Sequence, residues 1–117
     1  EAGPTPDPAP TAAAWQAQPA IGAGTGAAIG QLNYPNAPAL SPDGLILYVT
    51  DTNNNRIAVW KRSAVGAPWA PDAPIGSGPG AAIDQFDAPY GLALSADGRE
   101  LFVSDRDDCR VVVWRKG

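Results

Sequence analysis

The sequence predicts an all-β protein built from two copies of one unit. The chain repeats itself with a period of 54 residues and no gaps, and 21 of the 49 aligned positions of 15–63 and 69–117 are identical. Each copy contains short β-type runs separated by turn residues, and no segment has the period of an amphipathic helix. A repeat unit of this size cannot bury its apolar face alone, so two units call for something that completes them.

Three β-type runs follow one another in each unit. Asp43-Gly44 and Asp97-Gly98 join the first run to the second, and Asp-Gly supplies the positive φ that a tight hairpin needs. Asp- and Asn-rich segments, 51–55 and 105–109, join the second run to the third. The predicted strands are 36–40, 45–50 and 56–60 in the first unit and 90–94, 100–104 and 110–114 in the second.

A fourth run, 15–21 or 69–75, precedes each Gly-rich stretch and contains Pro, which is tolerated at a sheet edge. Residues 69–75 can pair with the third run of the first unit. Residues 15–21 have no preceding third run, and the third run of the second unit, which ends at Trp114, has no fourth run after it. This offset is typical of closed propellers, where it removes an exposed sheet edge.

Each unit resembles an NHL repeat. The first carries QLNYP, ALSPDG and LYVTDTNNNRIAVW within residues 31–60, and the second carries the matching segments within residues 85–114. The second unit departs from the family pattern at Asp108-Cys109, which replaces Asn-Asn. The first has Asn36-Ala37 where the family has Gly after Pro. The resemblance covers about residues 15–117.

The resemblance implies two four-stranded antiparallel propeller blades, at about 31–75 and 85–117. NHL propellers are usually six-bladed, so three copies would complete one ring. Residues 15–21 of each chain would then serve as the outer strand of a neighbour's second blade, in a head-to-tail homotrimer. The alternative is that the chain is a fragment of a longer propeller.

Composition excludes several classes of function. The net charge of −4, from 12 acidic and 8 basic residues, argues against a nucleic-acid partner. No apolar stretch is long enough for a membrane span. The chain has no histidine, which removes the usual general base and the commonest transition-metal ligand. We therefore expect no catalytic residue, no cofactor and no metal.

The first 14 residues, EAGPTPDPAPTAAA, are rich in Pro, Ala and Thr and are expected to form an extended linker or tail. Such spacers often follow an export signal or a lipid anchor, which favours a secreted or extracytoplasmic protein. A linker between two domains of a longer chain is the alternative.

Several repeated residues are expected to be structural. Asp51 and Asp105 recur at one repeat position and Arg56 and Arg110 at another, whereas a specific site usually breaks a repeat. We expect the carboxylates to cap the turns and the guanidinium groups to reach a neighbouring blade, rather than to bind a metal or substrate. Trp60 and Trp114 are expected to pack at the seam between twisted sheets.

These observations favour a non-catalytic scaffold that presents a loop-built face to a protein, peptide or glycan. One loop face should be acidic, from Asp-rich segments, and could attract cations or basic peptides. The alternatives are a metal-assisted hydrolase or lyase at the central channel, as the resemblance to propeller enzymes implies, and an assembly fragment without a ligand. The residues expected nearest the channel, and so the candidates for binding, are Asn33, Asn36, Asp87 and Tyr90.

Overall fold

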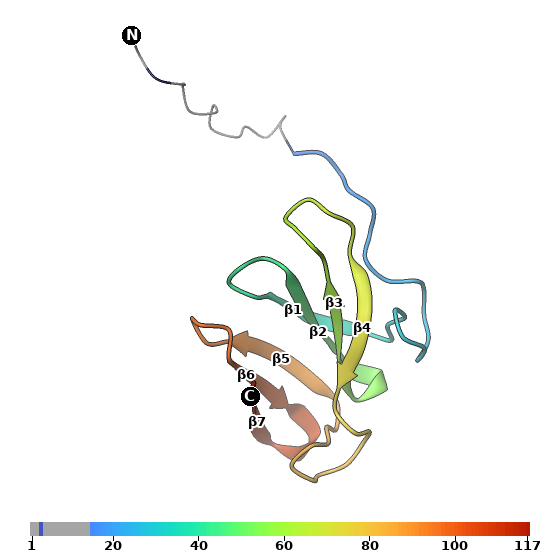
Figure 1. The fold of residues 1–117 in the computed structure, drawn as a ribbon. Coiled ribbons are helices and arrows are strands. Elements are labelled where there is room, and N and C mark those ends of the chain that lie inside the picture. Colours follow the sequence, from blue (N-terminus) through green and yellow to red (C-terminus); the bar gives the residue numbers. More distant parts are fainter. Residues whose placement is uncertain (1–2, 4–14) are drawn as a thin grey trace.

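The computed structural model describes residue 3 and residues 15–117; the predicted linker, residues 1–14, otherwise lies outside the described residues. Within the described part, the chain forms seven strands in two antiparallel sheets and no α-helix (Figure 1). The prediction of an all-β chain is confirmed. The same residues contain no helix that is long and apolar enough to cross a membrane.

The four-stranded sheet has the order β1-β2-β3-β4, and the three-stranded sheet has the order β5-β6-β7. Every strand begins and ends within one residue of the predicted bounds, and the predicted fourth run, 69–75, pairs with β3. The strands are β1 Pro35–Leu40, β2 Ile46–Asp51, β3 Arg56–Lys61, β4 Ala70–Ile75, β5 Pro89–Leu94, β6 Glu100–Asp105 and β7 Arg110–Arg115.

A short 3-10 turn connects the second strand of each repeat to the third. These turns are η2 Thr52–Asn54 in the first repeat and η3 Arg106–Asp108 in the second. Each turn ends on a residue in the left-handed conformation, Asn55 with φ 51° and Cys109 with φ 50°. Asn is several-fold enriched in this region of backbone space, so it suits the position better than Cys does.

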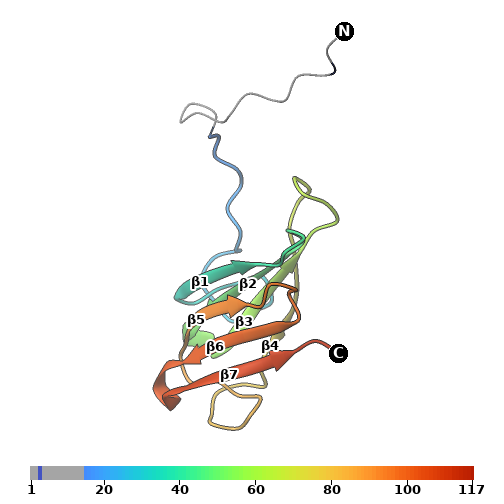
Figure 2. The same cartoon turned by 90° about the vertical axis from the view of Figure 1, so that its left-hand side faces the viewer.

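The apolar core lies between the two sheets, which approach each other most closely where β1 and β2 face β5 (Figure 2). Phe86 fills the centre, fully buried, with its ring 5.9 Å from the ring of Trp114. Its buried neighbours are Tyr48, Ile57 and Val59 from the four-stranded sheet and Leu101, Val103 and Val112 from the other.

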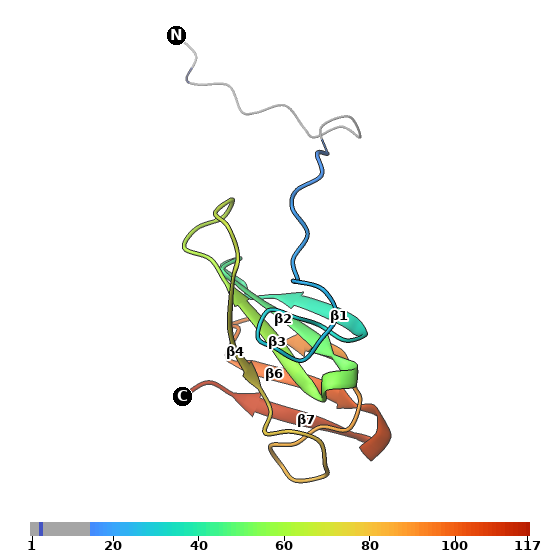
Figure 3. The same ribbon diagram turned by 90° about the vertical axis from the view of Figure 1, so that its right-hand side faces the viewer.

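The opposite face of the four-stranded sheet carries a second, smaller cluster of Val49, Ala58 and Trp60. Leu32 and Trp69 pack against this cluster. The loop of residues 22–32 crosses this side of the sheet (Figure 3). Trp114 packs against the core between the sheets, whereas Trp60 packs on the opposite face of the four-stranded sheet, against Leu32 and Trp69.

The run of residues 15–21, expected to serve as an outer strand, forms no strand within the chain, and Trp15 is almost fully exposed. The three-stranded sheet lacks a fourth strand beyond β7. The two ends of the repeated region are thus incomplete in complementary ways.

Candidate functional site

Each repeat contains an ion pair between a fully buried aspartate and a partly buried arginine. In the first, the fully buried Asp51 at the end of β2 lies 2.8 Å from the Nε of Arg56 at the start of β3. The other Asp51 oxygen accepts the Asn33 amide at 2.6 Å. The Arg56 guanidinium also donates to the carbonyl oxygens of Ala27, Ala28 and Gln31, at 2.7, 3.1 and 2.9 Å.

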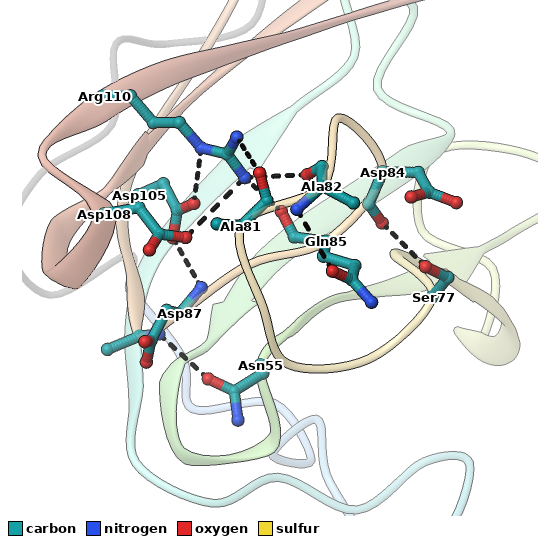
Figure 4. Close-up of polar contacts among 11 residues, drawn as sticks. Asn55, Ser77, Ala81, Ala82, Asp84, Gln85, Asp87, Asp105, Asp108 and Arg110 are labelled. Atoms are coloured by element: carbon teal, nitrogen blue, oxygen red, sulfur yellow. Dashed lines mark hydrogen bonds and ion pairs between the residues drawn. The ribbon is translucent and has the colours of Figure 1, made fainter.

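The second repeat reproduces this arrangement (Figure 4). Asp105 is fully buried, lies 3.0 Å from the Nε of Arg110, and accepts the Asp87 amide at 2.6 Å. Arg110 donates to the carbonyl oxygens of Ala81, Ala82 and Gln85, at 2.6, 2.8 and 3.0 Å. We call each Asp–Arg pair, with the loop carbonyls it holds, a clamp.

The clamps differ from the expected arrangement in two ways. Neither Asp51 nor Asp105 makes a side-chain hydrogen bond that caps its 3-10 turn. The guanidinium groups hold the loop that precedes β1 or β5 in their own repeat, and do not reach the neighbouring sheet. Because each carboxylate is fully buried and already paired, it is not exposed to an external ligand.

Gly-rich loops 22–32 and 76–86 use their backbone groups internally. The Ala23 amide donates to the Gly30 carbonyl at 2.8 Å, and in the second repeat the Ser77 amide donates to the Asp84 carbonyl at 2.9 Å. Each loop leads into a β-strand and not into a helix. They therefore lack the helix N-terminus of a phosphate-binding loop.

Three hydrogen bonds fasten one sheet to the other. Thr50 donates to the Tyr90 carbonyl at 2.9 Å, and Thr52 donates to the Pro89 carbonyl at 2.7 Å. The Ala88 amide donates to the side-chain oxygen of Asn55 at 2.9 Å. These three bonds and the core around Phe86 together form the internal junction.

The four predicted binding residues do not form one cluster. Asn36 and Tyr90 both lie at the internal junction, where Asn36 donates to Thr52 and the exposed Tyr90 ring lies 5.5 Å from the Arg106 guanidinium. Asn33 accepts from Asn53 beside the first turn, and Asp87 lies at the same place in the second repeat. No hydrogen bond between Asn33 and Asp87 occurs in the described part of the chain.

The second turn is acidic where the first carries amides. Asn33, Asn53 and Asn54 correspond to Asp87, Asp107 and Asp108. Within residues 15–117, no group of three or more His, Cys, Asp or Glu is arranged to hold a metal ion. Two guanidinium groups lie beside the carboxylates of this turn, Arg110 at 3.0 Å from Asp105 and Arg106 at 3.1 Å from Asp107.

Asp108 is the group most disturbed by this exchange of amides for acids. The Asn54 side chain donates to Asp51 at 2.8 Å and to the Gly26 carbonyl at 2.7 Å, which an ionised carboxylate cannot do. One Asp108 oxygen is buried without a hydrogen-bond partner, and its nearest cation, Arg110, is 3.7 Å away. Burial raises the pKa of the Asp108 carboxyl, and the adjacent Asp105 raises it further.

A scan against protein-family models and a search of curated proteins each found no match for this chain.

The feature that sequence reasoning missed is an uncovered apolar face on the three-stranded sheet. Phe102, Val111 and Val113 are 36%, 62% and 51% exposed, whereas the residues at the same repeat positions are 4%, 0% and 6% exposed. Those counterparts, Tyr48, Ile57 and Val59, are buried against the second sheet. We call Phe102, Ser104, Val111 and Val113 the free face.

Replacing Asp108 by Asn should raise the stability of the folded chain at neutral pH. The Asp108→Asn amide can donate to Asp105 as Asn54 donates to Asp51. Because the folded pKa of Asp108 lies above its ordinary value of 3.8, the wild-type folded state binds a proton more tightly than the unfolded state does. Asp108 therefore lowers the free energy of unfolding of the wild type most at pH values above its folded pKa. This destabilisation disappears as the pH falls toward 3.8.

Urea denaturation followed over this pH range checks the prediction. The Asp108→Asn chain should exceed the wild type at about pH 7, and the difference should shrink at lower pH. A difference that is absent at neutral pH, or constant with pH, would contradict it. The control is Asp84→Asn, which removes an exposed carboxylate of the same repeat and should change stability by less than about 0.5 kcal/mol.

Proposed function

We propose that this chain is a non-catalytic interaction module. In this proposal its two sheets are NHL-type blades, and three copies close into one six-bladed propeller. The ring presents to a protein or peptide its turn face, by which we mean the end of the ring that carries the turns η2 and η3. The observation that carries the proposal is the contrast between the two sheets. The same three apolar repeat positions are buried by the next sheet in the first repeat and exposed in the second.

The free face has the composition of an interface. Its centre is apolar, with Phe102, Val111 and Val113, and its rim carries the exposed ion pair of Arg115 with Glu100 at 3.0 Å. An apolar centre with a charged rim is the usual anatomy of protein–protein contacts. Since the equivalent face of the first sheet is covered by the sheet of the second repeat, another copy of the repeat is the partner of matching shape.

A non-catalytic role is supported by how the polar groups are used. The repeated carboxylates and arginines are bound to one another and to loop carbonyls in both clamps. The chain has no histidine. Two of the three remaining acidic groups at the second turn, Asp87 and Asp107, are not fully buried and lie at the end of the sheets where the loops meet.

The charge of this turn face favours a basic partner. The second turn carries four carboxylates against two guanidinium groups, whereas the first carries Asp51 against Arg56. In a trimer, three such acidic sectors would alternate with three neutral ones around the ring. A field of this kind attracts lysine- and arginine-rich segments, and its effect falls with salt.

Assembly can be tested by the mass of the full chain in solution. Light scattering should give about three times the 12.0 kDa of a single chain. The variant Val113→Lys, which places a charge on the free face, should be monomeric and retain the β-sheet circular dichroism of the wild type, because no contact between the chain's own sheets is lost.

The matched control for this test is Val65→Lys, at an exposed position between β3 and β4, which should leave the mass unchanged. A wild-type monomer that unfolds cooperatively would overturn the proposed trimer. So would a Val113→Lys variant that keeps the wild-type mass.

Binding can be tested with an oligolysine peptide by titration calorimetry. The double variant Asp87→Asn/Asp107→Asn restores the residue types of the first repeat, so its fold should persist. Its affinity should fall by about threefold to tenfold, since each exposed charge pair contributes up to about 1 kcal/mol.

Oligoglutamate should not bind, and added salt should weaken the oligolysine complex. Asp72→Asn, which removes an acid on β4, is the control and should bind as the wild type does. Equal binding of both peptides, or an unchanged affinity of the double variant, would overturn the assignment of the turn face to basic ligands.

A further inference from the structure

We infer that residues 16–21 of one copy add to the free edge of β7 in a second copy, in the register that β4 adopts against β3. This inference rests on the proposed assembly and specifies the strand pairing that connects one copy to the next. The internal pairs are Ile57–Ile75, Val59–Asp72, Trp60–Pro71 and Lys61–Ala70. The residue of β7 in each new pair lies 54 positions after its β3 counterpart, and the donated residue lies 54 positions before its β4 counterpart. The expected pairs are therefore Val111–Ile21, Val113–Gln18, Trp114–Ala17 and Arg115–Gln16.

The single proline of the donated segment falls where this register tolerates it. Pro19 corresponds to Ala73, which lies in the irregular part of the β3–β4 ladder between Asp72 and Ile75. The Ala73 amide donates to the side chain of Asp72 at 2.8 Å. A proline at this position therefore removes no hydrogen bond from the ladder.

The other side chains also suit the β7 edge. Ile75 packs against the core between the sheets, and Ile21, partly exposed in the single chain, has the same side chain for the same place. The internal ion pair of Lys61 with Asp72, at 2.7 Å, is replaced by Arg115 and Gln18. Arg115 already has Glu100 as its partner, so a neutral Gln leaves no charge unpaired.

The donated segment is kept away from the β7 edge of its own chain. Arg56 holds Ala27, Ala28 and Gln31 against the first repeat, so the segment enters the fold beside the four-stranded sheet. Figure 1 shows it on the far side of that sheet from β7. A second copy is therefore the occupant that the geometry favours.

The joint between copies differs chemically from the internal junction. The side chains that fasten the internal junction, Thr50, Thr52 and Asn55, correspond to Ser104, Arg106 and Cys109. Ser104 keeps the hydroxyl and accepts the Gly91 amide at 2.7 Å, as Thr50 accepts the Ala37 amide at 2.8 Å. Cys109 offers no amide oxygen to the partner backbone. The contact between neighbouring chains should therefore open before the internal junction between the two sheets of one chain does.

A disulfide tests the register in the full-length chain. Gln18→Cys and Val113→Cys are introduced together, with Cys109→Ser to remove the exposed native thiol. Directly opposed residues of antiparallel strands lie about 4.5–5.5 Å apart between Cα atoms, within disulfide range. Oxidation should give covalent trimers on a non-reducing gel.

The matched control is Gln18→Cys with Val111→Cys, on the same face but two residues out of register, where the separation is about 7–8 Å and too long to bridge readily. A trimeric mass with no cross-link, or equal cross-linking of the control, overturns the register but leaves the proposed assembly standing. A disulfide within one chain overturns the second copy as the occupant. A monomeric mass overturns both the register and the assembly.

Discussion

A β-sheet with apolar side chains on both faces must cover both, and this constraint governs the whole chain. The four-stranded sheet meets it: one face packs against the second sheet, and the other is covered by the loop of residues 22–32 and Trp69. The three-stranded sheet covers only the face around Phe86. Its free face and its unpaired β7 edge lie on the side where the next repeat would follow.

The clamps convert this repeated packing into a fixed geometry. Each guanidinium holds the loop that leads into its repeat, so the place where residues 15–21 enter the fold is set by Arg56. The second repeat keeps the clamp but exchanges the surrounding amides for acids. Asp108 cannot make the two hydrogen bonds that Asn54 donates, which lowers the stability of the folded chain. Under the proposed role, the same exchange supplies the negative charge by which the turn face binds a basic partner.

The strands and their pairing could be predicted because alternating apolar residues and Asp-Gly turns are local signals. The partners of Arg56 could not, since loop carbonyls such as that of Ala27 leave no mark in the pattern of side chains. The free face could not be predicted either. Phe102 and Val103 are adjacent and both apolar, so the sequence alone does not show which of the two side chains is covered; the packing of their counterparts Tyr48 and Val49 in two different clusters does. The four candidate binding residues were assigned through a resemblance to a ring, and a single chain does not gather them.

Amide hydrogen exchange along β7 tests the central claim most directly, because it reports whether this strand has a neighbour in solution. If residues 16–21 of another copy pair with β7, its amides that point away from β6 should exchange as slowly as the equivalent amides of β3. Dilution should then speed their exchange. Fast exchange at every protein concentration, at the rate of an open sheet edge, would contradict the account.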